Sequence, residues 1–142
     1  MCGIFGYAST KENNAFEVIH RGLKRLEYRG YDSWGVSVLQ NGTIKTYKTT
    51  QDLSKNPKNI VVKAKTGIGH TRWATHGGVT KNNAHPHYSS DKSFVLAQNG
   101  IVENFLDLKT FLEKSGYTFS TQTDTEVIVK LIEYYFKNAW SL

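Results

Sequence analysis

The chain has 142 residues, 39% of them hydrophobic and 13% aromatic, which suits one domain with a core of its own. It contains no apolar run long enough to span a bilayer and no apolar segment behind basic residues at its start, so we expect no membrane helix and no signal peptide. The net charge of +6 comes from dispersed lysines without interleaved aromatics, and no nucleic-acid-binding motif is present, so we expect no nucleic-acid partner.

The first thirty residues predict a strand and a helix. Residues 3–8 are apolar and flanked by glycines, which is typical of a buried strand. Apolar side chains then recur at helical spacing, so we expect a helix from Asn13 to Tyr28 with Gly30 as its C-cap. The apolar side chains of this helix are Ala15, Phe16, Ile19, Leu23 and Leu26.

The middle of the chain predicts several strands and one long loop. Asn41-Gly42 is a strong hairpin signal, and a polar loop or short helix is expected from Gln51 to Asn59. Residues 75–83 are polar and lack apolar periodicity, so they predict a loop, and loops of that length are often functional. Strands are expected at residues 34–39, 43–48, 60–64, 67–73 and 93–98.

The last third predicts two helices and a short strand. A helix is expected from Glu103 to Ser115 with Gly116 as C-cap, followed by a strand at 117–120. Thr123-Asp124-Thr125-Glu126 matches the capping box that starts a helix. The first helix should bury Phe105, Leu108, Phe111 and Leu112. The second should bury Val127, Ile128, Leu131, Ile132 and Tyr135.

Cys2 is the only cysteine, which excludes an intramolecular disulfide and is typical of a reducing, cytoplasmic setting. The small side chain at this position would permit removal of Met1, which leaves a thiol and a free α-amine on one residue. The α-amine has an ordinary pKa of about 7.7–8.0, so near neutral pH it can accept the thiol proton. The alternative is a small buried hydrophobe, which is what a lone cysteine more often is.

Three further positions could complete a site around this thiol. Asn99-Gly100 offers a side-chain amide and an unshielded backbone N–H, the donors that an oxyanion needs, although Asn-Gly is also a type I′ turn. Arg72 can bind a carboxylate through two hydrogen bonds or form a structural ion pair. Asp124 can bind an ammonium group or act only as a favourable charge in the first turn of a helix.

The histidines raise the alternative of a metal site. His70, His76, His85 and His87 lie close together in the sequence, and imidazole is a common zinc ligand. No Asp, Glu or Cys lies between His70 and His87, and no HExxH motif is present. We therefore expect structural histidines that hydrogen-bond the loop, and neither a metal nor another cofactor.

Taken together, six short stretches resemble the class II, N-terminal-nucleophile glutamine amidotransferases, and within them the branch that makes glucosamine 6-phosphate from fructose 6-phosphate. The matching stretches occur in order along nearly the whole chain, and although each is weak alone, the set is specific. They are residues 2–4, 26–33, 69–77, 83–87, 99–104 and 123–126.

The resemblance implies a role for each matching position. Cys2 would be the nucleophile, with its own α-amine as the base. Asn99 and Gly100 would form the oxyanion hole, and Arg29 would order the site around the nucleophile. Arg72 would bind the carboxylate of glutamine and Asp124 its amine. A loop that closes over glutamine would contain Trp73, Thr75 and His76.

The resemblance also implies a fold and a reaction. The fold is α+β, an αββα sandwich, here expected to be a partial glutamine amidotransferase type-2 domain over residues 1–142 that is incomplete at its C-terminus. L-Glutamine would be hydrolysed through a thioester, and the ammonia would pass to a sugar-phosphate isomerase domain or subunit. The alternatives are a non-catalytic remnant that binds a partner and, more distantly, a metal-dependent hydrolase.

Two positions depart from the family pattern. Trp34 stands where relatives usually have a small residue, and we expect its indole to displace other packing. Gln98 stands where relatives usually have a histidine before the Asn-Gly pair.

Overall fold

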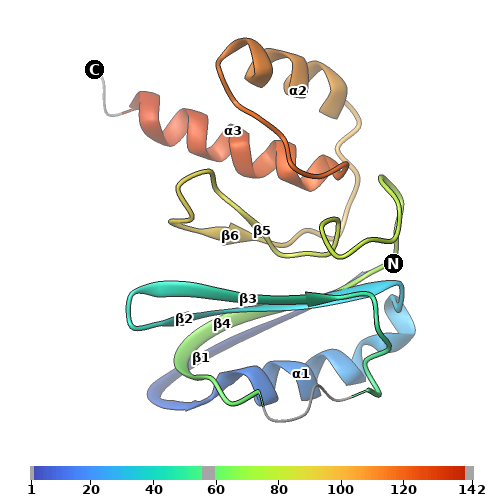
Figure 1. Cartoon of the computed structure of the whole chain (residues 1–142), viewed down its shortest axis with the longest axis vertical. Coiled ribbons are helices and arrows are strands. Elements are labelled where there is room, and N and C mark those ends of the chain that lie inside the picture. The colour runs from blue at the N-terminus through green and yellow to red at the C-terminus, as the bar shows by residue number, and fades with distance from the viewer. Residues whose placement is uncertain (1, 56–59, 140–142) are drawn as a thin grey trace.

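The computed structural model describes residues 2–55 and 60–139 and shows four layers stacked on one another (Figure 1). Met1, whose removal the nucleophile hypothesis requires, lies outside the described residues, as do residues 56–59 of the expected polar loop. Helix α1 (Ala15–Arg25) forms the first layer, and a four-stranded sheet the second. A two-stranded sheet and a pair of helices, α2 (Phe105–Lys114) and α3 (Asp124–Ala139), complete the order α, β, β, α.

The larger sheet is antiparallel, in the order β1-β4-β2-β3. Its strands are β1 (Gly3–Asn14), β2 (Ser33–Gln40), β3 (Thr43–Thr49) and β4 (Lys63–Arg72). Asn41 and Gly42 both adopt positive φ between β2 and β3, as a type I′ turn requires, and β2 pairs with β3, which confirms the predicted hairpin.

Helix α1 packs on the outer face of this sheet because glycines let it approach closely. A Cβ atom on Gly69 of β4 would lie 2.3 Å from the Cγ2 of Ile19, so only glycine fits beneath the helix. Ile19 and Leu23 are fully buried there. The predicted apolar stripe of this helix therefore does face the core, although the helix is shorter than expected: it ends at Arg25, and a separate 3₁₀ turn, η1 (Glu27–Arg29), follows.

Trp34, the first departure from the family pattern, lies in the same core and is 2% exposed. Its indole N–H donates to the carbonyl of Gln51 at 2.8 Å. The ring packs between α1 and β3, with its centroid 5.0 Å from that of His20 and 5.3 Å from that of Tyr47. Aromatic and polar partners thus accommodate the large side chain.

The second half of the sandwich is built on the short strands β5 (His87–Tyr88) and β6 (Val95–Leu96), which are paired antiparallel. Leu112 of α2 is fully buried, and Phe111 contacts Tyr134 of α3 edge-on at 5.1 Å. Gly116 has a φ of +88° and its N–H donates to the Glu113 carbonyl, which confirms the predicted C-cap. No helix within the described ranges is long and apolar enough to cross a membrane.

Four strand predictions are wrong in detail. Residues 60–64 and 67–73 were expected as two strands, but β4 is continuous, because it lies at the centre of the sheet and is hydrogen-bonded on both sides. The strand predicted at 93–98 is reduced to β6. Residues 117–120 form no strand, because the N–H groups of Ser120 and Thr121 donate to the Glu126 carboxylate instead.

The buried faces of the last two helices also differ from the prediction. In α2 only Leu112 is buried, and Phe111 is 41% exposed. In α3 the polar residues Glu126, Lys130 and Glu133 are buried, whereas Ile132 and Tyr135 are exposed. Hydrogen bonds to the neighbouring loops hold the polar face inward, and apolar periodicity cannot detect them.

The capping box is half formed: the Thr123 hydroxyl accepts from the Glu126 N–H, but the Glu126 carboxylate binds Ser120 and Thr121.

Candidate active site

Strand pairing places Cys2 at the edge where several segments meet. Gly3 of β1 pairs with Thr71 of β4, so Cys2 lies beside the end of β4 and the residue that follows it, Trp73. The Trp73 N–H donates to the Cys2 Sγ at 3.3 Å, and the Gly3 N–H donates to the Thr71 hydroxyl at 3.1 Å. The thiol is therefore fixed at the start of the sheet rather than disordered at a chain end.

Two of the predicted residues hold the backbone of Cys2. The Asn99 side chain forms a pair of hydrogen bonds: its Oδ1 accepts from the Cys2 N–H at 3.2 Å, and its Nδ2 donates to the Cys2 carbonyl at 3.0 Å. Arg29 Nε donates to the same carbonyl at 3.1 Å. Gly100 is not among the glycines with positive φ, so the type I′ turn considered for Asn99-Gly100 is wrong.

Arg72 ends β4 and is buried, with 3% of its surface exposed. Its guanidinium donates to backbone carbonyls of the loop that follows, those of His76, Gly77 and Gly78, and within the described residues it forms no ion pair. Burial lowers the pKa of Arg72, and the nearby charges of Cys2, Asp32 and Asp124 oppose this. The guanidinium is thus a buried cation held by carbonyl groups that carry no full negative charge.

Asp124 is the first residue of α3 and is 4% exposed. Its Oδ2 accepts from the Val102 N–H at 2.8 Å, which ties the start of the helix to the segment after Gly100. The carboxylate is therefore fixed both by the helix and by this hydrogen bond.

A cavity of about 20 Å³ joins most of the predicted residues. Of the nine, only Asn99 and Arg29 do not line it, and both hold Cys2 from outside. The lining residues among the nine are Cys2, Gly100, Arg72, Trp73, Thr75, His76 and Asp124. The cavity is small because the carbonyls of residues 76–78 fold over the Arg72 guanidinium.

The cavity also includes residues that the sequence reasoning did not select. These are His85, Gln98, Thr123 and Thr125. Three of them are immediate neighbours of selected residues, and that adjacency is the signal that could have found them. Gln98, the second departure from the family pattern, accepts a hydrogen bond from the Thr125 hydroxyl at 2.9 Å and so links the Asn-Gly segment to α3.

Two further polar side chains outside the prediction fix the loop. Asp32 Oδ2 accepts from the Ala74 N–H at 2.8 Å. Asn83 Nδ2 donates to the Gly78 carbonyl at 2.9 Å, while its Oδ1 accepts from the Gln122 N–H at 3.0 Å. The loop over Arg72 is thus anchored at both ends.

Three histidine rings contact one another beside the site: His70 stacks on His85, and His85 meets His87 edge-on. Ring centroids of His70 and His85 are 4.2 Å apart, and those of His85 and His87 are 4.6 Å apart. His70 Nε2 bonds the Gln98 carbonyl and His87 Nε2 bonds the Thr123 hydroxyl. Burial lowers the pKa of His70 to about 4 and that of His87 to about 2, so near neutral pH the rings are uncharged. Among the described residues, no group of three or more His, Cys, Asp or Glu side chains is placed to hold a metal ion.

A comparison of the sequence with protein-family models identifies the family of this chain. A family model described as "Glutamine amidotransferase domain" matches residues 44–140. The chain belongs to this family, and its fold is the α+β sandwich of N-terminal-nucleophile amidotransferases.

Similar proteins with assigned names include glutamine–fructose-6-phosphate aminotransferases. The chain is 48% identical over 136 residues to the glutamine–fructose-6-phosphate aminotransferase (isomerizing) of Methanococcus maripaludis, and 49% identical over 138 residues to that of Bacteroides thetaiotaomicron. Each match covers 94% of this chain and 22% of the relative, so the chain spans about a fifth of the length of these relatives.

Solved structures agree with this assignment. The glutamine phosphoribosylpyrophosphate amidotransferase of B. subtilis matches with a TM-score of 0.77 and 29% identity. A structure described as the allosteric regulatory enzyme of purine biosynthesis matches with a TM-score of 0.79 and 31% identity. Each match covers 94% of this chain and 29% of the other.

Proposed function

We propose that this chain hydrolyses L-glutamine to glutamate and ammonia, with Cys2 as the nucleophile. One observation carries the proposal: the Cys2 thiol shares a cavity with a buried cation, Arg72, and a buried anion, Asp124. An α-amino acid presents the complementary pair of charges, a carboxylate and an ammonium group. The site therefore suits a substrate with both groups beside a reactive amide.

The proposed chemistry begins when removal of Met1 frees the α-amine of Cys2. This amine takes the thiol proton, and the thiolate attacks the side-chain amide carbon of glutamine. The carbonyl oxygen becomes negative and accepts hydrogen bonds from the Gly100 N–H and from the Asn99 Nδ2 hydrogen that does not bond the Cys2 carbonyl. The C–N bond then breaks, ammonia leaves with the proton from the amine, and water hydrolyses the thioester to glutamate and the free thiol.

Substrate entry requires the loop of residues 73–78 to move. A cavity of about 20 Å³ holds roughly one water molecule, and the loop carbonyls occupy the donors of Arg72 that a substrate carboxylate would use. A carboxylate carries a full charge, so it binds a guanidinium more strongly than neutral carbonyls do. In this proposal Trp73, Thr75 and His76 then close over the bound glutamine.

The ammonia acceptor is proposed from the relatives, whose names describe transfer to fructose 6-phosphate. We propose that residues 1–142 are a glutaminase domain that supplies ammonia to a sugar-phosphate isomerase domain or subunit for glucosamine 6-phosphate synthesis. A catalytic free thiol fits a reducing compartment, and we place the protein in the cytoplasm.

Glutamate release from L-glutamine by the chain with a native N-terminus tests the proposal. Mass spectrometry of the same sample establishes that Met1 has been removed. A folded, processed chain that releases no glutamate would favour the alternative of a non-catalytic remnant that binds a partner.

Arg72→Lys is expected to raise the KM for glutamine by about tenfold or more with a smaller change in kcat. Lysine keeps the charge but cannot make two parallel hydrogen bonds to a carboxylate. Steady-state kinetics with glutamine measures the effect, and Lys45→Met, at an exposed position of β3, is the control for a changed charge elsewhere. A variant with unchanged KM would show that Arg72 does not bind the substrate carboxylate.

A further inference from the structure

Gln98 is held by the fold at three of its four polar groups. Its backbone carbonyl accepts a hydrogen bond from His70 Nε2 at 2.9 Å, and its backbone N–H donates to His85 Nδ1 at 3.4 Å. Its side-chain oxygen, Oε1, accepts from the Thr125 hydroxyl at 2.9 Å. Three segments of the chain, β4, the loop before β5 and α3, therefore fix both the backbone and the direction of the side chain.

The fourth polar group of Gln98 is the side-chain nitrogen Nε2, which has no hydrogen-bond partner within the described residues. Gln98 lines the cavity that contains the Cys2 thiol. A Cβ atom on Gly100 would lie 3.2 Å from Nε2, so the amide lies against Gly100, which is another residue of the cavity wall. The fold thus leaves a pair of N–H donors available at the wall of this cavity.

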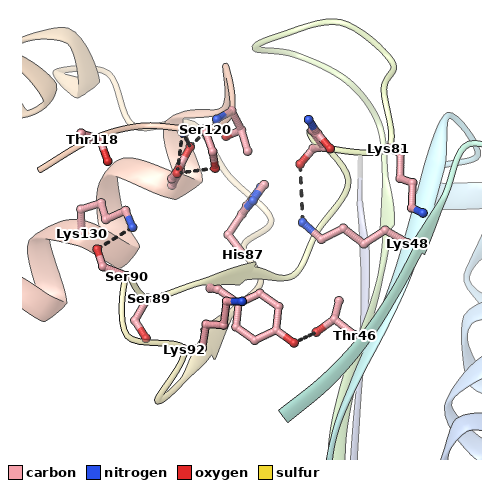
Figure 2. A pocket seen from close by; sticks show the side chains of 14 residues that line it. Thr46, Lys48, Lys81, His87, Ser89, Ser90, Lys92, Thr118, Ser120 and Lys130 are labelled. Atoms are coloured by element: carbon pink, nitrogen blue, oxygen red, sulfur yellow. Dashed lines mark hydrogen bonds between the residues drawn. The ribbon is translucent and has the colours of Figure 1, made fainter.

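Polar side chains in the wider cleft between the two halves of the sandwich show the opposite situation (Figure 2). The Lys130 ammonium group donates to the Ser90 hydroxyl at 2.8 Å, and the Ser120 hydroxyl donates to the Glu126 carboxylate at 3.0 Å. Each of these groups bonds another residue of the chain, as polar groups removed from water generally do. The half-buried Gln98 amide has no such partner, which indicates a group that bonds a ligand.

The two hydrogens of Nε2 can only be donated, so a ligand at this position must present an acceptor such as an oxygen atom. In the proposed hydrolysis of glutamine, the Gly100 N–H binds the side-chain carbonyl oxygen, which becomes negative when the thiolate attacks. Nε2 lies beside the same glycine. We propose that Gln98 is a further catalytic residue, whose Nε2 donates a third hydrogen bond to this oxygen beside those from Asn99 and Gly100.

This role rests on the proposed function, and it determines which kinetic constant Gln98 affects. The carbonyl oxygen of bound glutamine is neutral, whereas the oxygen of the tetrahedral intermediate carries a negative charge. A donor to this oxygen is therefore worth more in the transition state than in the bound substrate, so its loss lowers kcat more than it raises KM. Because three hydrogen bonds already hold Gln98, its amide is in place before the charge develops.

Steady-state glutamate release from L-glutamine by the 142-residue chain with a native N-terminus tests the proposal. Gln98→Met removes the donor but keeps a flexible side chain of similar length. It should lower kcat by about tenfold or more and change KM by less than about twofold, since the loss of one oxyanion donor acts mainly on the transition state. Gln98→His restores an N–H group at this position and should retain most of the kcat.

Thr125→Val is the matched control, because it removes the hydroxyl that bonds Oε1 and leaves Nε2 of Gln98 unchanged. If Gln98 acted only by tying the segment before Asn99 to α3, Gln98→Met and Thr125→Val would lower kcat equally. We instead expect a clearly smaller fall in Thr125→Val. Circular dichroism establishes that each variant is folded.

Three results would each overturn the donor role of Gln98. They are an unchanged kcat in folded Gln98→Met, a raised KM alone in this variant, and equal falls in kcat for Gln98→Met and Thr125→Val. In all three cases the unmodified chain still releases glutamate, so the proposed function stands. A processed chain that releases no glutamate would, by contrast, overturn the proposed function and the role of Gln98 with it.

Discussion

Replacing Cys2 with alanine is expected to lower glutamate release by a factor of about 10³ or more. The variant keeps the backbone amide and carbonyl that Asn99 and Arg29 bind, so the surrounding structure has no reason to rearrange. It removes the one atom that can form a thioester. In the proposed mechanism, hydrogen bonds to the substrate cannot replace the covalent step. The measurement is glutamate formation under saturating glutamine, with both chains processed at Met1.

A chain extended ahead of Met1 is the control that separates the thiol from the α-amine. The extension converts the amine into an amide, which cannot accept a proton, while Cys2 and its hydrogen bond to Trp73 remain. Activity should fall as it does in Cys2→Ala. Full activity in the extended chain would contradict the amine as the base, and full activity in Cys2→Ala would contradict the nucleophile itself.

Much of the site was accessible from the sequence because its parts lie at the ends of predicted elements. Cys2 starts a strand, Arg72 ends one, and Asp124 starts a helix. Each is marked by a local pattern, such as the capping box around Asp124. The convergence of Cys2 and Arg72 follows from the antiparallel pairing of β1 and β4, which places the start of one strand beside the end of the other.

The residues that sequence reasoning missed act through contacts between distant segments. Gln98 meets Thr125, and Asn83 meets Gln122, across 27 and 39 residues of chain. No periodicity or spacing encodes such pairs. The same holds for the buried polar face of α3, where Lys130 reaches Ser90. Apolar patterns in the sequence predict which helices and strands form. Which face of a helix is buried also depends on hydrogen bonds between segments that meet only in the folded chain.

The unfolding free energy is expected to fall as pH drops from about 6.5 to about 4, chiefly because of the histidine cluster. His70 is fully buried, and burial, with the nearby Arg72 charge, lowers its pKa from 6.5 to about 4, although the bond to the Gln98 carbonyl opposes this. Between these two pH values the unfolded chain binds a proton that the folded chain excludes. The contribution of neutral His70 to the free energy of unfolding is therefore complete above about pH 6.5 and is lost as the pH falls toward 4. The fall in pKa corresponds to about 3 kcal/mol from His70 alone.

Urea denaturation at pH 7 and pH 4.5 measures this loss, and His70→Gln isolates its source. Glutamine can still donate to the Gln98 carbonyl but carries no titrating group. The drop in unfolding free energy between pH 7 and pH 4.5 should therefore be about 2 to 3 kcal/mol smaller in the variant than in the unmodified chain. His85 and His87 remain, and because their pKa values are also lowered by burial, some dependence persists. Carboxylates with lowered pKa values, such as Asp91 at about 2, lose their stabilising charge mainly below pH 4 and so fall outside the window. An equal loss in His70→Gln and the unmodified chain would show that His70 is not kept neutral by the fold.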